Sequence, residues 1–170
     1  MNIRQAKKED LPALNTLVNS AYRGDSSRKG WTTEADLLDG IRTSESSLEE
    51  MINKENAVIL LAEENGLKGC VYLEQQEMNL YLGMLTVAPE LQNKGLGSTL
   101  MQAAEERAKQ LGCTKIKMTV ITSRHELIAY YNRKGFNDTG TRQPFPNDPK
   151  FGIPKQPLQF MVMEKNILSY

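Results

Sequence analysis

Apolar residues recur along this chain with two periodicities, and each predicts a type of secondary structure. Six segments have the apolar runs or the alternation typical of strands: residues 1–5, 57–62, 68–73, 79–87, 115–121 and 158–163. Five segments are predicted to be helices: residues 11–21, 33–38, 46–54, 97–111 and 124–134. The mixture and order of these elements indicate an α/β protein.

Three connections constrain how these elements are arranged. Asn65 and Gly66 separate two predicted strands, and an Asn-Gly pair is a signal for an antiparallel hairpin. The segments 79–87, 97–111 and 115–121 follow one another as strand, helix and strand, which predicts a parallel crossover. Residues 143–157 contain prolines at 144, 146, 149 and 154, so they are predicted to be a loop.

Polar residues near the starts of three predicted helices are candidate caps. Asp10 precedes the first apolar residue of the helix 11–21 and is a candidate N-cap. Ser46 with Glu49, and Ser123 with Glu126, have the spacing of a capping box. These residues predict where the first, third and fifth helices begin.

Composition favours one domain that covers residues 1–170. The chain has 170 residues with 39% hydrophobic content, which suits one core. Lys and Arg number 21, as do Asp and Glu, so no overall field attracts nucleic acid or an anionic membrane. The N-terminal residues lack the apolar segment of a signal peptide, and no run of about 18 apolar residues occurs. We therefore expect neither a nucleic-acid partner nor a membrane partner.

The few cysteines and the single histidine limit the possible chemistry. Cys70 and Cys113 lie in apolar stretches without CxxC spacing, and His125 is the only histidine. A histidine-rich metal cluster is excluded, and we expect no metal site and no Ser-His or Cys-His nucleophile system. Two cysteines in apolar stretches suit a reducing, cytoplasmic setting.

A glycine-containing loop, QNKGLGST at residues 92–99, joins the strand 79–87 to the helix 97–111. Gly95 and Gly97 permit positive φ and a close approach of the backbone to a ligand. Backbone N–H groups at a helix start, with the helix dipole, favour a phosphate or pyrophosphate. Lys94, Ser98 and Thr99 can add donors. The spacing fits neither a Walker A loop nor a dinucleotide fingerprint, and a plain helix-start turn is the alternative.

The order LGMLTVAPELQNKGLGSTLM, a strand at 115–121, and then ELIAYYNRKGF resembles the GNAT superfamily of acetyl-CoA-dependent N-acyltransferases. In that family a Gln/Arg-x-x-Gly-x-Gly/Ala loop binds the CoA pyrophosphate, and residues 92–97 match it. The strand before it offers backbone groups to the pantetheine arm. A helix that ends in Tyr-x-x-x-Gly-Phe follows, matched by residues 131–136. Arg124 stands where the family often has Asn, which is a departure from the pattern.

The resemblance implies acetyl-CoA as cosubstrate and a single GNAT-like α/β domain. Its central sheet is expected to be mixed and mostly antiparallel, with about six to seven strands, flanking helices and one parallel crossover. The implied cofactor-binding residues are Leu85, Thr86, Val87, Gln92, Asn93, Lys94, Gly95, Leu96, Gly97, Ser98 and Thr99.

Acetyl transfer needs a proton for the thiolate that leaves, and the resemblance assigns this general-acid role to Tyr131. Tyr130 is turned about 100° away on a helix, so only one of the two tyrosines can face a cleft well. A role for Tyr131 in packing or in hydrogen bonding to the cofactor is the alternative.

Backbone N–H groups near Leu85 are expected to bind the oxyanion. The strand 79–87 carries no Asp, Glu or His, so the general base is not named. Candidate carboxylates elsewhere are Glu34, Glu63, Glu74 and Glu126.

Acceptor recognition is expected in the polar segments 20–38 and 141–154, because loops often carry binding residues. Trp31 is a candidate wall of an acceptor pocket, with core packing as the alternative. Glu34 is a candidate partner for a cationic amine, with an exposed helix position as the alternative. The expected acceptor is a small-molecule amine that attacks directly in a ternary complex. A protein or peptide acceptor and a non-catalytic acyl-CoA sensor stay open, as do a monomer and a homodimer.

Overall fold

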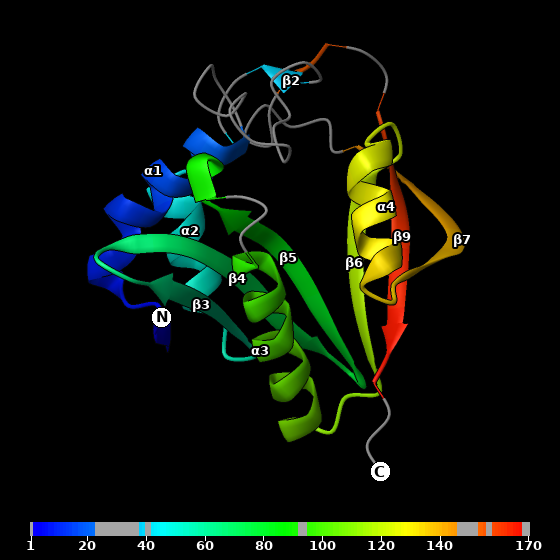
Figure 1. Ribbon diagram of the computed structural model, residues 1–170, viewed down its shortest axis with the longest axis horizontal. Coiled ribbons are helices and arrows are strands. Elements are labelled where there is room, and N and C mark those ends of the chain that lie inside the picture. Colours follow the sequence, from blue (N-terminus) through cyan, green and yellow to red (C-terminus); the bar gives the residue numbers. More distant parts are fainter. Residues whose placement is uncertain are drawn as a thin grey trace.

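The computed structural model describes residues 2–22, 38–39, 42–91, 95–145, 153–155 and 158–167. Figure 1 shows a sheet with helices on both faces. The strands are β1 (Asn2–Gln5), β2 (Leu38–Asp39), β3 (Ala57–Glu63), β4 (Leu67–Gln76), β5 (Asn79–Val87), β6 (Lys115–Ile121), β7 (Asn137–Pro144), β8 (Ile153–Pro154) and β9 (Gln159–Asn166). The helices are α1 (Leu11–Tyr22), α2 (Glu45–Ile52), α3 (Leu96–Gln110) and α4 (His125–Arg133), with short 3-10 helices η1 (Lys8–Asp10) and η3 (Pro89–Leu91).

The main sheet has seven strands in the order β1-β3-β4-β5-β6-β9-β7, and β2 pairs with β8 separately. The β5–β6 pair is parallel, and the other adjacent pairs in the main sheet are antiparallel. Helix α3 connects β5 to β6, as the crossover requires. The predicted fold class, with its mostly antiparallel sheet and one parallel crossover, is confirmed.

Strands β3 and β4 are buried on both faces because helices cover both sides. On one face α1 packs on a core that contains Ile59 and Tyr72. On the other face α3 and α4 share a second core that contains Val58 and Leu73. Adjacent residues of one strand enter different cores since strand side chains alternate in direction. The hairpin turn has positive φ at Asn65 and Gly66, as an Asn-Gly turn predicts.

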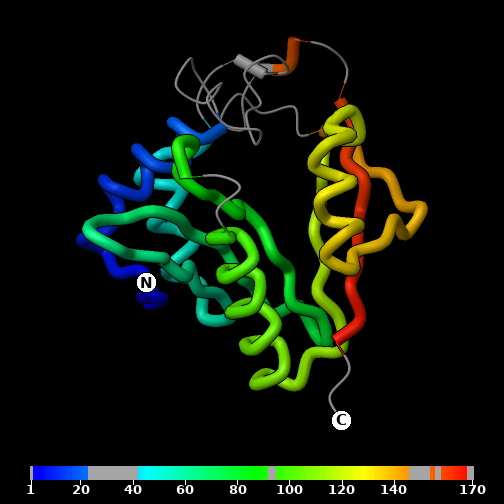
Figure 2. Tube along the Cα trace, viewed as in Figure 1, coloured from blue at the N-terminus to red at the C-terminus, as the bar shows by residue number. Residues whose placement is uncertain are grey.

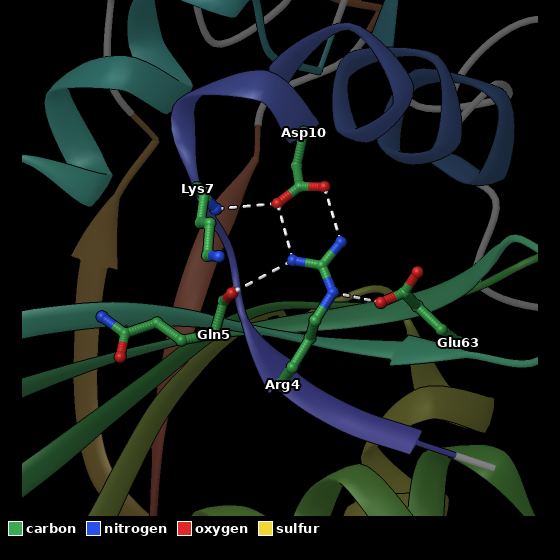
Figure 3. A network of polar contacts seen from close by, with 5 residues as sticks. All are labelled: Arg4, Gln5, Lys7, Asp10 and Glu63. Carbon is green, nitrogen blue, oxygen red and sulfur yellow. Dashed lines mark hydrogen bonds and ion pairs between the residues drawn. The ribbon is translucent and has the colours of Figure 1, made fainter.

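A polar cluster fastens the N-terminal strand to its neighbours (Figure 3). The Arg4 guanidinium donates two hydrogen bonds to the Asp10 carboxylate, at 2.7 and 2.8 Å, and another to Glu63. The backbone N–H of Lys7 donates to the same Asp10 carboxylate at 2.8 Å. The cluster therefore joins β1 to η1 and β3, and it lowers the pKa of Asp10 mainly through the hydrogen bond from Arg4.

The predicted helix caps are wrong in each case. The N-cap of α2 is Ser44, whose hydroxyl accepts from the Ser47 N–H at 3.2 Å, rather than Ser46. Helix α4 is preceded by Arg124 without a side-chain cap, rather than by Ser123. Asp10 lies in η1 and its carboxylate binds Arg4 and Lys7 instead of capping α1. Several polar residues stand near the start of each helix, so the spacing alone does not single out the capping residue.

The structure also corrects the strand predictions near the C-terminus. Residues 137–144 form β7, which the sequence did not predict, and the predicted loop 143–157 overlaps β7 and β8. All residues of β7 are exposed, so the strand has no apolar alternation to reveal it. Pro144 is tolerated because β7 is an edge strand.

One helix prediction is also corrected. Leu38 lies in β2 rather than in the predicted helix 33–38, whose other residues are outside the described ranges.

Candidate active site

Strands β5 and β6 meet at one end and then diverge (Figure 2). They pair only where Asn79 faces Lys115, Leu80 faces Ile116 and Tyr81 faces Lys117. Beyond Tyr81, β5 stays paired with β4 and β6 stays paired with β9. The two halves of the sheet therefore separate toward the carboxyl ends of β5 and β6.

A bulge in β5 lies beside this divergence. Cys70 of β4 faces Thr86 and Tyr72 faces Gly83, so Met84 and Leu85 together oppose one residue. Met84 has a φ of +53°, a left-handed conformation that is unfavourable for a side chain with a Cβ. A bulge bends a strand and increases its twist. It therefore turns the end of β5 away from the direction of β6.

A cleft with a volume of about 610 Å³ lies where the strands diverge. Residues of β5, β6, β7 and β9 line it together with residues of α1, α2 and α4. The lining includes the polar or charged residues Tyr22, Arg42, Lys117, Arg124 and Tyr131. A cavity of this size is in the range of small-molecule sites.

Tyr131 projects from α4 to the cleft and is only 6% exposed. Its ring packs edge-on against Tyr130 and Phe136, with centroid separations of 5.4 and 6.0 Å. Burial raises the pKa of Tyr131 far above that of a free phenol, and the nearby hydroxyls of Tyr22 and Tyr130 add to this effect. The hydroxyl is therefore protonated at neutral pH.

Tyr130 points away from the cleft toward the start of α3. Its hydroxyl lies 3.9 Å from the Met101 sulfur, and a Cβ on Gly97 would lie 3.0 Å from the same oxygen. Of the two tyrosines, Tyr131 lines the cleft and Tyr130 packs against α3, as the helical spacing predicts. A side chain at position 97 would therefore have to displace the Tyr130 hydroxyl slightly.

The glycine loop begins α3, as predicted. Gly95 is the N-cap residue with a φ of +84°, and Leu96 is buried in the core beside it. Gly97 lies within the helix and does not use the positive φ that glycine permits. Gln92, Asn93 and Lys94 lie outside the described residues.

The two hydroxyls of the loop already have partners within the protein. The Lys134 ammonium donates to the Ser98 hydroxyl at 2.5 Å. The Thr99 hydroxyl donates to the Gly95 carbonyl at 3.1 Å, which is a contact within the helix. Lys134 follows α4 and also lies 5.6 Å from the centroid of the Tyr130 ring. The fold thus brings a second cation to the start of α3 in addition to any contribution from Lys94.

The three predicted strand residues lie at the end of β5. The Leu85 carbonyl accepts a hydrogen bond from the Tyr22 hydroxyl, which reaches it from α1. Thr86 is fully buried and its hydroxyl donates to the Met84 carbonyl at 2.9 Å. Val87 packs in the core shared with α3. The backbone of this segment therefore runs from the cleft to the glycine loop.

The candidate bases in the described ranges are not among the residues that line the cleft. Glu63 binds Arg4. Glu74 accepts hydrogen bonds from Tyr72, Gln76 and Lys54. Glu126 is exposed on α4. The other acceptor-site candidates, Trp31 and Glu34, lie outside the described residues.

The described residues contain no group of three or more His, Cys, Asp and Glu side chains suited to hold a metal ion. None of their helices combines the length and the apolar character needed to cross a membrane.

Sequence reasoning missed three residues that the fold brings to this region: Tyr22, Arg42 and Lys134. Tyr22 continues the apolar stripe of α1, which gave a signal for its burial but none for its contact with Leu85. Arg42 follows a polar segment and carries no pattern of its own. Lys134 stands one residue before a helix-ending glycine, where a cation is common for helix-dipole reasons.

Comparison with known proteins identifies the family. A family model described as the acetyltransferase (GNAT) family matches residues 14–136. The chain belongs to this family. The match spans α1 through α4, and therefore includes the diverging strands, the glycine loop and Tyr131.

Individual relatives agree with the GNAT assignment. The uncharacterized N-acetyltransferase YhfO of Bacillus subtilis (strain 168) is 30% identical over 148 residues, which cover 82% of this chain and 93% of the relative. The ribosomal-protein-S18-alanine N-acetyltransferase of Escherichia coli has a similar fold, with a TM-score of 0.73, 18% identity, and coverage of 99% of this chain and 95% of that one. The PaiA N-acetyltransferase of Thermoplasma acidophilum, solved in complex with coenzyme A, has a TM-score of 0.71, 21% identity, and coverage of 97% and 98%.

Proposed function

We propose that this GNAT protein transfers an acetyl group from acetyl-CoA to the amine of a small molecule by direct attack in a ternary complex. The observation that carries the proposal is the placement of Tyr131, a buried and protonated phenol on the wall of the cleft between β5 and β6. Membership of an acetyltransferase family and the coenzyme A bound to the PaiA relative support acetyl-CoA as the cosubstrate.

The cofactor is assigned to the start of α3 and the end of β5. Residues 92–99 would hold the pyrophosphate, because the N-terminus of α3 supplies N–H groups and a favourable dipole. Lys134 would add a charge-assisted contact to the same phosphates, since its ammonium lies at Ser98. The backbone of Leu85, Thr86 and Val87 would bind the pantetheine arm, which places the thioester near the cleft.

In the reaction, the amine nitrogen attacks the thioester carbonyl carbon and its oxygen becomes an oxyanion. Backbone N–H groups near Leu85 would stabilise this oxyanion, and such donors are most effective in a dry site. The carbon–sulfur bond then breaks, and the Tyr131 hydroxyl gives its proton to the sulfur that leaves. The nitrogen releases the proton that the amide product does not keep, and this proton returns through water to the Tyr131 oxygen. A free phenol would lose about 2 kcal/mol in protonating a free thiolate. Burial raises the pKa of Tyr131 and therefore increases the free-energy cost of this proton transfer. Burial also raises the basicity of the thiolate, which reduces the cost.

The amine must lose a proton before it attacks. A lysine-like amine is neutral in only about one molecule in 2,500 at pH 7. Among the described lining residues there is no Asp, Glu or His. We assign the proton to solvent water in the cleft, which can accept it without a dedicated side chain.

A cytoplasmic location fits the state of the cysteines. Cys70 and Cys113 are both free thiols and both are buried. Burial raises the pKa of Cys70 to about 12, which makes the thiol a poor nucleophile. The cysteines therefore act as packing residues in this proposal.

The test is the release of CoA thiol from acetyl-CoA in the presence of amines. The panel contains amino acids, polyamines, aminoglycosides and lysine peptides. We expect amine-dependent release from wild type and a fall in kcat of about 100- to 10,000-fold for Tyr131→Phe, because a general acid contributes rate of this order. Tyr72→Phe is the matched control, since Tyr72 is also buried but is not among the residues that line the cleft.

Other outcomes separate the alternatives. Binding of acetyl-CoA without release of thiol for any amine would favour a non-catalytic sensor. Release that depends on lysine peptides alone would favour a protein acceptor. Full activity of Tyr131→Phe would remove the tyrosine from the mechanism.

A further inference from the structure

In the part of the cleft that the structure describes, all the charged lining residues are cationic. These residues are Arg42, Lys117 and Arg124, and Asp and Glu are absent from the described lining. The whole chain is neutral, with 21 cationic and 21 acidic side chains, so this excess is local. A wall of cations favours an anionic ligand and disfavours a ligand that carries several ammonium groups.

The three cations differ in how their charge is compensated. The Lys117 ammonium lies 3.3 Å from the Glu164 carboxylate, so an ion pair already neutralises it. Arg124 lies at the start of α4, close enough to Tyr131 to counteract part of the rise in the pKa of that phenol. Within the described ranges, no carboxylate forms an ion pair with Arg42. Arg42 is therefore a lining cation whose charge no described carboxylate neutralises, and it can bind an added anion.

Arg42 is also held in a defined position. Its backbone N–H donates to the Asn19 side-chain oxygen at 2.6 Å, which fastens it to α1. Its guanidinium lies over the Tyr22 ring, 5.3 Å from the centroid. The Tyr22 hydroxyl in turn donates to the Leu85 carbonyl. These contacts connect the Arg42 guanidinium, through Tyr22, to the β5 backbone at Leu85, near which the oxyanion is expected to form.

We propose that the acceptor is an amine that also carries an anionic group, a carboxylate, phosphate or phosphonate, and that Arg42 binds this group. The inference rests on the proposed function and names the substrate class for the same cleft. A guanidinium binds such groups with two parallel hydrogen bonds, which fixes the orientation of the ligand. The anionic group at Arg42 would direct the amine toward the thioester. Cations nearby also disfavour the ammonium form, which helps to supply the neutral nucleophile in a cleft without a described base.

The test compares methionine with methioninamide, two acceptors that differ only in the anionic group. We would measure kcat and KM at saturating acetyl-CoA for this pair, and also for aminomethylphosphonate and for spermidine. Wild type should favour the anionic acceptors. Arg42→Gln should lower kcat/KM for methionine by about 10- to 100-fold, mainly through KM, and leave methioninamide almost unchanged. Comparing the methionine-to-methioninamide ratio between Arg42→Gln and wild type cancels the difference between the amine pKa values.

Two control variants separate a binding role from a structural one. Arg42→Lys should recover part of the preference, since it keeps the charge but loses the planar fork. Arg107→Gln removes one positive charge from the last turn of α3, outside the cleft lining, and should leave both acceptors unchanged. Equal losses for methionine and methioninamide in Arg42→Gln, or spermidine as the best acceptor of wild type, would overturn the inference.

A binding experiment keeps this inference separate from the proposed function. Aminomethylphosphonate would be titrated calorimetrically into the CoA-loaded protein, whether or not any acceptor is acetylated. Binding that weakens in Arg42→Gln supports the anion site even if the protein is not an enzyme. Absence of binding to wild type overturns the anion site even if amines are acetylated.

Discussion

At the scale of single residues, burial determines the chemistry of the cleft. Tyr131 and Tyr130 are neighbours in sequence, yet one is buried at the cleft and the other packs against Gly97. Burial raises the pKa of both phenols, by far the most for Tyr131, which keeps that hydroxyl a proton donor. The position of a residue around its helix, rather than its type, thus separates the two roles.

The two glycines of the loop are predicted to respond differently to alanine. Gly95 has a φ of +84°, so Gly95→Ala forces a Cβ into the left-handed region and should lower stability by about 1–2 kcal/mol. Gly97 is helical, and Gly97→Ala gains helix propensity of up to about 1 kcal/mol that offsets the displacement of the Tyr130 hydroxyl. Urea unfolding of the two variants measures the difference. Equal destabilisation by both substitutions would contradict this account.

At the scale of elements, pairs of segments distant in sequence meet through a few polar side chains. Arg4 connects β1 with η1 and β3 (Figure 3), and Lys134 connects the end of α4 with the start of α3. Each connection supports a different feature. The first fixes the edge of the sheet, and the second lies at the predicted phosphate site.

Asp10→Asn should destabilise the protein in a manner that depends on pH. The pKa of Asp10 is lowered in the folded state by the hydrogen bond from Arg4. A lowered carboxyl pKa stabilises the fold above the unfolded value of about 4, and this contribution disappears as the pH falls through the folded value. We expect the melting temperature of the variant to lie about 2–4 °C below wild type at pH 7. The gap should close on acidification, and a gap that is independent of pH would contradict the assignment.

Lys134→Gln should weaken the binding of coenzyme A. The ammonium lies 2.5 Å from the Ser98 hydroxyl at the first turn of α3, where the pyrophosphate is expected. Loss of a charge-assisted contact should raise the Kd by about 10-fold and reduce the dependence of Kd on salt. Lys109→Gln, at the opposite end of α3, is the matched control. Calorimetric titration at two salt concentrations measures both effects, and equal affinity of Lys134→Gln and wild type would exclude the contact.

At the scale of the whole molecule, two groups of strands meet along a short seam. The seam consists of three facing residue pairs between β5 and β6, after which each strand belongs to its own half. The core shared by α3 and α4 also spans both halves. A ligand in the cleft would contact both groups and add a third connection. The prediction that residues 1–170 form a single domain stays a prediction.

Coenzyme A should therefore stabilise the protein strongly against heat. At a free concentration about 100 times its Kd, a ligand that binds only the folded state contributes about 2.7 kcal/mol. For a chain of this size we expect the melting temperature to rise by about 5–10 °C. Differential scanning calorimetry with increasing coenzyme A tests this expectation. The same series with adenosine is the control, and a rise that is no larger with coenzyme A would contradict binding across the cleft.

The sequence by itself determined the elements whose signals are local. The hairpin, the strand 115–121, the glycine-started α3 and the parallel crossover follow from periodicity and turn chemistry, and the structure has each of them. The edge strand β7 could not be predicted because its residues are all exposed and lack alternation. The caps were wrong for separate reasons: Ser44 stands close to Ser46 and caps α2, α4 begins after Arg124 without a side-chain cap, and Asp10 binds Arg4.

Only the tertiary structure decided which residues meet at the cleft. Tyr22 and Leu85 are 63 positions apart and Ser98 and Lys134 are 36 apart, so no local pattern connects either pair. The divergence of β5 from β6 likewise depends on pairing with β4 and β9, which a single strand does not encode. Local chemistry therefore predicted the loop, and the resemblance to the GNAT family pointed to the tyrosine, while long-range packing placed Arg42 and Tyr22 in the cleft and Lys134 beside the loop.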